Sequence, residues 1–231
     1  MCGIAGFMDL ERRSGSQELE ALGRAMAATL NHRGPDAHGV WSDAEAGIVF
    51  GHTRLAIVDL SAAGAQPMVS SCGACVITYN GEIYNVAELK PELEASGRRF
   101  KGHSDTEVLV EAIAEWGLPA TVERLIGMFA FAVWDRRTRR LSLVRDRLGI
   151  KPLYWGRQNG RLVFASELKA LEVLPGWQPE LNQDALAAFM RLAYVPSPHS
   201  IYRGIHKLEP GHIAVVDAGG NVETSAFWSL A

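Results

Sequence analysis

The sequence predicts an α+β fold in which helices cover antiparallel β-sheets. Strand-like runs rich in Val, Ile, Phe, Tyr and Thr dominate the chain and often alternate between apolar and polar residues. Consecutive runs are joined by tight turns, as at Asn159-Gly160, a pair that supplies the positive φ angles of a type I′ turn. Helical segments lie between these runs. Strands joined by tight turns pair antiparallel, and we expect the helices to pack on the outer faces of the resulting sheets.

The strand-like runs can be read directly from the sequence. They occupy residues 3–9, 47–59, 74–85, 128–134 and 141–146. Three hairpins are expected: 129–145 turning at 135–140, 153–165 turning at 159–160, and 213–227 turning at 219–221.

Two longer helices are expected between these runs. Residues 17–31 place an apolar stripe on one face, and residues 105–117 do the same. The second helix opens with Ser104-x-x-Glu107, a capping-box pattern that satisfies backbone donors at a helix start. Shorter helices are expected at 86–96, 119–127, 166–173 and 183–193.

Composition excludes several classes of protein. The 231 residues are 48% hydrophobic and 21% charged, the mix of a soluble globular chain. The net charge of -3 gives no reason to expect a nucleic acid or an anionic membrane as partner. No run approaches the roughly 20 apolar residues of a membrane helix, and the first residues lack the pattern of a secretory signal. The sequence therefore predicts a cytoplasmic protein.

The three cysteines are Cys2, Cys72 and Cys75. An odd number without a secretory signal argues against a disulfide framework. Cys72 and Cys75 have the C-x-x-C spacing, but a structural zinc needs four ligands and no second pair completes a site. A redox pair would prefer a helix start, and these residues precede a strand-like run. We therefore expect no metal site and favour an ordinary loop, with a redox role as the alternative.

Cys2 is the first candidate for chemistry. Once Met1 is removed, residue 2 carries a thiol and a free α-amine on the same carbon atom. Their reference pKa values are about 8.5 and about 7.7–8.0, so proton transfer between them is easy. Such a residue is a nucleophile with its own base. Taken alone, however, a cysteine at position 2 is more simply explained by chance.

Further motifs follow Cys2 in a fixed order. They read Met1-Cys2-Gly3-Ile4-Ala5-Gly6, His32-Arg33-Gly34-Pro35-Asp36, Gly51-His52-Thr53-Arg54-Leu55-Ala56-Ile57-Val58-Asp59, Tyr79-Asn80-Gly81-Glu82-Ile83-Tyr84-Asn85 and His103-Ser104-Asp105-Thr106-Glu107-Val108. In their order and in their residues, these motifs resemble those of the class II glutamine amidotransferases, most closely the glutaminase domain of asparagine synthases. The resemblance covers essentially the whole chain, through residues 145–154, 166–171 and 194–198.

The resemblance implies a four-layer α/β/β/α sandwich of two antiparallel sheets, the fold of N-terminal nucleophile hydrolases. It makes Cys2 the nucleophile that attacks the side-chain carboxamide of glutamine. It pairs Arg54 with the substrate α-carboxylate, which suits a planar guanidinium, although a surface arginine is the plainer interpretation. It places Asp105 on the substrate α-ammonium, although an acid in the first turn of a helix is favourable anyway.

Asn80-Gly81 supports two interpretations. Between strand-like residues the pair is typical of a hairpin turn, and the residues alone favour this. The resemblance instead makes the Asn80 amide and the Gly81 N–H an oxyanion hole, and lets Glu82 help hold the substrate amine. It also lays one segment along the bound glutamine: Arg54, Leu55, Ala56, Ile57 and Val58.

The resemblance also implies what this chain lacks. Asparagine synthases join the glutaminase to an ATP-using synthetase domain with a Ser-Gly-Gly-x-Asp-Ser loop, which is missing here, as is any G-x-x-x-x-G-K-[ST] loop. We expect residues 1–193 to form the glutaminase and residues 194–231 its end and the passage toward an absent synthetase domain. Glutamine hydrolysis then needs no cofactor, and ATP and magnesium belong only to that absent domain.

The expected partners are L-glutamine and a synthetase domain, fused or associated at the C-terminal side, and the resemblance suggests a homodimer. The leading hypothesis is a glutaminase that supplies ammonia for the ATP-dependent conversion of aspartate to asparagine. One alternative keeps the glutaminase but amidates another carboxylate in a polysaccharide or peptide pathway. A second alternative is a non-catalytic regulatory module of the same fold.

Overall fold

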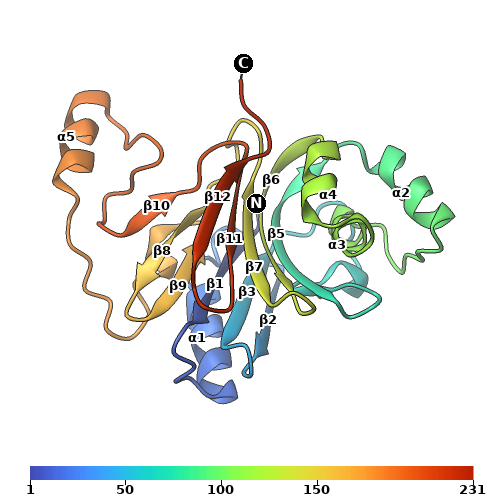
Figure 1. Ribbon diagram of the computed structural model, residues 1–231, viewed down its shortest axis with the longest axis horizontal. Coiled ribbons are helices and arrows are strands. Elements are labelled where there is room, and N and C mark those ends of the chain that lie inside the picture. Colours follow the sequence, from blue (N-terminus) through green and yellow to red (C-terminus); the bar gives the residue numbers. More distant parts are fainter. Residues whose placement is uncertain (231) are drawn as a thin grey trace.

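The computed structural model describes residues 1–230 and contains two six-stranded antiparallel sheets (Figure 1). The first sheet has the order β10-β8-β9-β1-β3-β2, formed by Ile205–Lys207, Tyr154–Gln158, Arg161–Ala165, Gly3–Asp9, Ile48–Arg54 and Ala37–Asp43. The second has the order β12-β11-β7-β6-β5-β4, formed by Val222–Ala226, His212–Val216, Arg140–Arg145, Gly127–Asp135, Cys75–Ile83 and Met68–Val69.

Helices cover the outer faces of both sheets (Figure 1). Helix α1 (Ser16–Ala28) packs on β1, β2 and β3 of the first sheet. On the second sheet, α3 (Asp105–Trp116) packs on β5 and is flanked by α2 (Val86–Ala95) and α4 (Leu118–Arg124). The chain is thus a four-layer α/β/β/α sandwich, which confirms the predicted fold.

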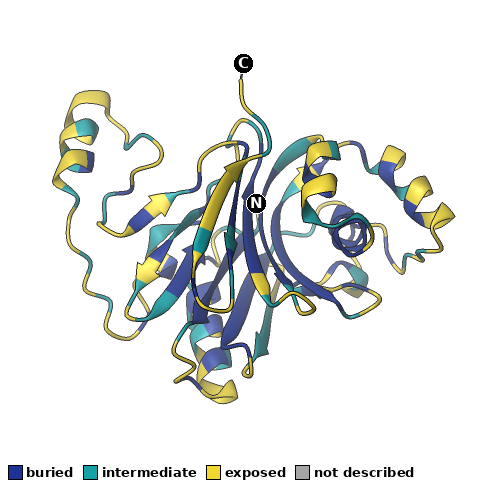
Figure 2. Cartoon of the chain, in the orientation of Figure 1, coloured by how far each residue is buried: buried dark blue, intermediate teal, exposed yellow. Residues whose placement is uncertain are grey.

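The strands pack both faces because their side chains alternate. In β1, Ile4 and Met8 face the second sheet, whereas Ala5 and Phe7 face α1. The same alternation in β6 sends alternate residues into the layer between the sheets and into the layer under α3. Figure 2 shows these strands and α3 as the buried part of the molecule, while α5 (Gln183–Leu192), at the far edge, is largely exposed.

Most predicted elements are confirmed. The three hairpins are β6–β7, β8–β9 and β11–β12. At the turn between β8 and β9, Asn159 and Gly160 have φ angles of 47° and 72°, as a type I′ turn requires. Strands β10, β11 and β12 complete the edges of the two sheets, and the domain division at residue 193 stays a prediction.

Three local predictions were wrong, and one strand was missed. The run 47–59 is strand only to Arg54, after which the chain leaves the sheet. The helix predicted at 166–173 is reduced to a 3₁₀ turn at Leu168–Ala170. Asn80-Gly81 is not a turn, because both residues lie within β5 and pair with β6. Strand β2 was not predicted at all: its residues, only partly buried, lack clear alternation.

The capping box at the start of α3 is half formed. The Ser104 hydroxyl accepts the Glu107 N–H at 3.2 Å, as predicted. The Glu107 carboxylate, however, accepts the N–H groups of Lys101 and Gly102 at 2.8 and 2.9 Å. The Glu107 carboxylate therefore fastens the loop before the helix and does not accept the Ser104 N–H, as a complete capping box would require.

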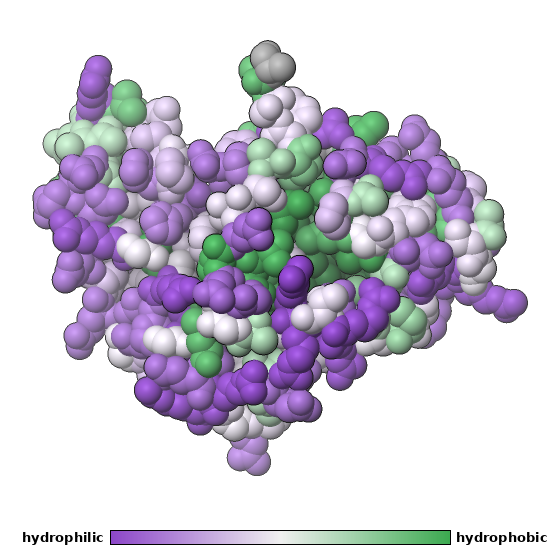
Figure 3. Space-filling model, in the orientation of Figure 1, coloured by the Kyte–Doolittle hydropathy of each residue, from purple (hydrophilic) through white to green (hydrophobic). Residues whose placement is uncertain are grey.

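Two surface features complete the fold. No helix within residues 1–230 is long and apolar enough to cross a membrane. On the face seen in Figure 3, apolar residues gather in a hollow beside β12 and α4. The hollow lies where α2–α4 leave the outer face of the second sheet uncovered, and its apolar lining includes Leu118, Val133, Ile213, Val215 and Phe227.

Candidate active site

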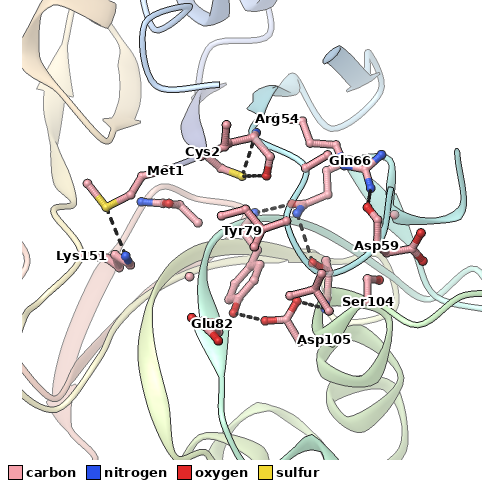
Figure 4. A pocket seen from close by; sticks show the side chains of 18 of the residues that line it. Met1, Cys2, Arg54, Asp59, Gln66, Tyr79, Glu82, Ser104, Asp105 and Lys151 are labelled. Carbon is pink, nitrogen blue, oxygen red and sulfur yellow. Dashed lines mark hydrogen bonds between the residues drawn. The ribbon is translucent and has the colours of Figure 1, made fainter. Parts of the chain in front are cut away.

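A pocket of about 160 Å³ lies at one edge of the layer between the sheets (Figure 4). Its walls come from the residues before β1, the end of β3 and the loop after it, β5, and the first turn of α3. All ten predicted site residues line it: Cys2, Arg54, Leu55, Ala56, Ile57, Val58, Asn80, Gly81, Glu82 and Asp105.

Sheet periodicity explains why Cys2 and Asn80 meet there. Cys2 lies two residues before Ile4, whose side chain points toward the second sheet. Asn80 lies four residues after Val76, which points back toward the first sheet. The two side chains therefore enter the same layer from opposite sides.

The Cys2 thiol is held against the chain that follows β3. The Leu55 N–H donates to Sγ at 3.4 Å, and the thiol reaches the Leu55 carbonyl at 3.7 Å. Burial raises the pKa of the thiol, although the Leu55 N–H, the chain's N-terminal charge and Arg54 partly offset this. A base close to Sγ is therefore needed to produce the thiolate at neutral pH.

Arg33 holds the Cys2 backbone. Its Nε donates to the Cys2 carbonyl oxygen at 3.0 Å, and its Nη1 pairs with the Glu167 carboxylate at 2.8 Å. His32 also contacts Glu167, at 3.0 Å, but its side chain is half exposed and does not line the pocket.

Asn80 presents a hydrogen-bond donor to the site. Its side chain is 2% exposed, and within residues 1–230 its amide nitrogen Nδ2 has no hydrogen-bond partner. Leaving such a buried donor without a partner costs about 1–3 kcal/mol. A buried donor that no protein atom accepts from, in the wall of a pocket, is suited to bind an acceptor atom of a ligand.

Gly81 adds a backbone donor to the same wall. Along β5 the N–H groups of Tyr79 and Ile83 point away from β6, to Gln66 Oε1 at 2.7 Å and to Asp105 Oδ2 at 3.0 Å. Alternate residues of a strand share this direction, so the Gly81 N–H points the same way. Glycine is required here, because a Cβ would lie 2.5 Å from the Met128 carbonyl oxygen.

Asp105 is a buried carboxylate with hydrogen bonds but no cation. It accepts the Tyr79 hydroxyl at 2.6 Å, the Ile83 N–H at 3.0 Å and the Thr106 N–H at 2.9 Å. Burial raises its pKa. No ion pair among residues 1–230 involves it. Because buried charges are usually paired, a cationic ligand group would complete this site.

Arg54 is already engaged with the loop beside it. It donates to the Ser61 carbonyl at 2.8 Å and to the Asp59 carbonyl. A guanidinium has five N–H groups, so donors remain for a ligand in the pocket. Arg54 therefore fastens the loop as well as lining the site, a structural role that the sequence did not reveal.

Asp59 is the second anchor of that loop. Its carboxylate accepts the Ser61 N–H and hydroxyl at 2.8 and 2.6 Å and the His103 N–H at 2.9 Å. The Ser61 hydroxyl, the His103 N–H and the Ser61 N–H lower its pKa to about 2. Ile57 and Val58, between the two anchors, are 74% and 56% exposed at the pocket rim.

Sequence reasoning missed several residues of the pocket wall. Tyr79 belongs to the Tyr79–Asn85 motif and could have been suspected from it, whereas Gln66 lies in no motif. Gln66 nevertheless bridges the Tyr79 N–H and the Thr106 hydroxyl, at 2.7 and 3.1 Å. The others are Met1, Asp59, Gly64, Ser104, Thr106, Met128 and Lys151.

The remaining cysteines lie away from the pocket. Cys72 is exposed and Cys75 is buried under α3, at the start of β5. Residues 1–230 contain no group of three or more His, Cys, Asp or Glu side chains that could hold a metal ion.

Comparison with known proteins extends these observations. Asparagine synthetase (glutamine-hydrolyzing) 3 of Bacillus subtilis (strain 168) is 38% identical over 233 residues, covering 100% of this chain and 37% of that protein. Amidase chry2 of Gibberella zeae is 31% identical over 237 residues, covering 100% of this chain and 34% of that protein. The chain thus spans about a third of the length of these relatives.

A solved structure shares the fold. Glutamine phosphoribosylpyrophosphate amidotransferase from B. subtilis superposes with a TM-score of 0.72 at 21% identity, covering 98% of this chain and 49% of that chain. Residues 1–228, nearly the whole sequence, match the family described as glutamine amidotransferase domain. This chain therefore belongs to the glutamine amidotransferase domain family.

Proposed function

We propose that this chain hydrolyses glutamine to glutamate and ammonia, with Cys2 as the nucleophile once Met1 has been removed. The observation that carries the proposal is the buried Asn80 amide without an acceptor, in the wall of the pocket that also holds the Cys2 thiol. The partnerless donor suits an oxygen atom that gains negative charge during reaction.

The reaction begins at Sγ. The Cys2 α-amine takes the thiol proton, and Sγ attacks the carboxamide carbon of glutamine. The carbonyl oxygen gains the negative charge and accepts hydrogen bonds from Asn80 Nδ2 and the Gly81 N–H. The amine returns the proton to the leaving nitrogen, and ammonia departs. Water then hydrolyses the γ-glutamyl thioester, which releases glutamate and the thiol.

The rest of the pocket suits the α-carbon end of the substrate. Asp105, buried and without a cation, would pair with the α-ammonium, with the exposed Glu82 nearby at the mouth. The remaining N–H groups of Arg54 would bind the α-carboxylate, and residues 55–58 would lie along the substrate.

For the fate of the ammonia, we propose the ATP-dependent conversion of aspartate to asparagine, in a synthetase domain on the C-terminal side. Support comes from the B. subtilis relative, which is a glutamine-hydrolyzing asparagine synthetase and is longer than this chain. ATP and magnesium would bind in that domain. The Gibberella amidase keeps a second candidate open, the amidation of another carboxylate with ammonia from the same pocket. A non-catalytic module is disfavoured because the pocket retains Cys2, Asn80 and Asp105 together.

The test is an assay of ammonia release from glutamine. Intact-mass spectrometry first establishes that Met1 is absent. We expect Cys2→Ala to lose at least about 10³-fold in kcat, and Cys72→Ala, at an exposed cysteine, to retain full activity. Equal ammonia release by the wild type and Cys2→Ala would refute the proposal.

A further inference from the structure

Lys151 is a buried cation whose hydrogen-bond partner is the residue that must be removed. Its side chain lines the pocket and is 5% exposed. Its Nζ donates to Met1 Sδ at 3.1 Å, beside Cys2 (Figure 4). Within residues 1–230, no ion pair involves Lys151. A lysine is almost never this buried without a carboxylate, so its charge needs another explanation.

The backbone of Lys151 is held on both sides by hydrogen bonds to buried side chains. The buried Asp146 carboxylate accepts the Lys151 N–H at 3.0 Å, together with those of Phe129, Leu148 and Ile150. Arg145 donates to the Lys151 carbonyl at 2.9 Å. The loop therefore aims the ammonium into the pocket from a rigid position.

The other charged groups around Cys2 are divided by sign. Arg54 from β3 and Arg33 are cations, but Arg54 is bound to loop carbonyls and Arg33 is paired with Glu167. Asp105 from α3 and Glu82 from β5 are anions in the same pocket, and both favour a protonated amine at Cys2. Figure 4 shows Lys151 on one side of Cys2, with Arg54 and Asp59 on the other.

Removal of Met1 changes this arrangement. It takes away the sulfur atom that accepts from Lys151 and creates the free α-amine of Cys2 in the same part of the pocket. Resting on the proposed function, we propose that Lys151 is a positioning residue that keeps the Cys2 α-amine in its neutral, proton-accepting form. It acts by like-charge repulsion, which penalises the protonated amine.

The size of the effect is enough to matter. An α-amine with a pKa of about 7.7–8.0 is mostly protonated at pH 7, about one part in ten being the free base. A like charge in the same pocket disfavours the protonated amine, and a pKa lower by about one unit would bring the free base to roughly half. The anions Asp105 and Glu82 act in the opposite direction, so a fixed cation is needed to balance them.

The experiment compares Lys151→Met, Lys151→Arg and Lys151→Gln after Met1 removal. Lys151→Met keeps the length of the side chain without its charge, Lys151→Arg restores a cation, and Lys151→Gln substitutes if the Met variant fails to fold. Lys101→Met, at an exposed lysine outside the pocket, is the control. The first readout is the pH profile of kcat/KM for ammonia release.

We expect the acid limb of that profile to move upward by about one pH unit in Lys151→Met, and to stay at the wild-type pH in Lys151→Arg and Lys101→Met. A loss of activity at every pH without movement of the acid limb would mean a structural role and would overturn the proposal.

A second readout does not depend on catalysis. The rate of iodoacetamide alkylation at Cys2, followed on the N-terminal peptide by mass spectrometry, reports the ionisation of the aminothiol at each pH. We expect its midpoint to rise by about one pH unit in Lys151→Met. An unchanged midpoint overturns the role of Lys151, whereas a wild type that alkylates normally but releases no ammonia overturns the proposed function instead.

Discussion

The two walls of the pocket are built by different means. The wall with Cys2, Asn80 and Gly81 is built on the sheets: Asn80 and Gly81 lie in β5, paired with β6, and Cys2 directly precedes β1. The opposite wall, residues 55–66, has left the sheet and is fastened by the polar contacts of Arg54, Asp59 and Gln66. Asn80 is 2% exposed, whereas Ile57 is 74% exposed.

This difference in construction suggests that the two walls have different roles. Under the proposed function, the groups that would meet a reacting atom lie on a strand, as Asn80 and Gly81 do, or directly before one, as Cys2 does. Residues 55–58, which are proposed to lie along the rest of the substrate, belong to a loop that can adjust when a ligand enters. Changes in the strand wall should therefore reduce kcat, and changes in the loop should chiefly affect KM.

After the loss of Cys2 itself, Asn80→Asp should give the largest effect. The variant keeps the shape of the side chain but replaces the partnerless N–H₂ donor with an oxygen. Loss of one oxyanion donor typically lowers kcat by about 10²–10³-fold, and a negative charge there adds repulsion. Steady-state ammonia release measures kcat and KM separately.

The matched control is Asn159→Asp, the same change in the turn between β8 and β9. It should leave both constants unchanged. If Asn80→Asp raised KM and spared kcat, Asn80 would be a substrate contact and not an oxyanion donor.

Asp105→Asn should come next, with its main effect on KM. Removing the charge that is proposed to pair with the substrate α-ammonium should raise KM by about 10–100-fold, with a smaller change in kcat. Because burial raises the pKa of Asp105, its carboxylate disfavours the folded state at neutral pH, and protonation relieves this cost as pH falls. The ligand-free variant should therefore be at least as stable as the wild type, while glutamine should no longer raise its Tm.

Glu107→Gln provides the comparison on the same helix. Glu107 accepts two backbone N–H groups and does not line the pocket. This variant should lose stability and keep the wild-type KM. A Glu107→Gln variant that raised KM as much as Asp105→Asn would show that the start of α3, rather than the Asp105 charge, controls binding.

The strand wall was easier to predict from sequence than the loop. The runs that became β1, β5, β6 and β7 stand out because alternation and β-branched residues mark strands. Strand pairing overturned one interpretation of the sequence. Asn80-Gly81 is typical of a turn, yet β5 continues through this pair because Gly81 lets β6 approach closely. Local turn preference was overridden by packing against a neighbouring strand.

The loop wall shows why other features could not be predicted. Residues 55–59 are largely apolar, so the sequence pattern extends the predicted strand through them. Their positions in the structure depend instead on hydrogen bonds to residues far along the chain, such as His103. Lys151 reaches the pocket only because Asp146 and Arg145 fold its loop back. Contacts of this kind leave no periodicity in the sequence.

Asp59→Asn should have the smallest effect and test the loop directly. The Asp59 carboxylate holds Ser61 and His103, and an amide would retain only part of these contacts. We expect KM to rise only about 2–5-fold, since Arg54 still holds the Asp59 and Ser61 carbonyls, with kcat unchanged. Limited proteolysis should cut the loop 55–66 faster in the variant, and glutamine should slow the cut in both proteins.

The pH dependence of this anchor follows from its charge. Because its pKa in the folded protein is lowered to about 2, the contribution of Asp59 to loop order is complete above about pH 4 and is lost only as pH falls toward 2. Proteolysis of the loop should therefore be independent of Asp59 ionisation between pH 5 and 8. If kcat fell with KM in Asp59→Asn, the loop would position the nucleophile through Leu55, and the two walls would act as one unit.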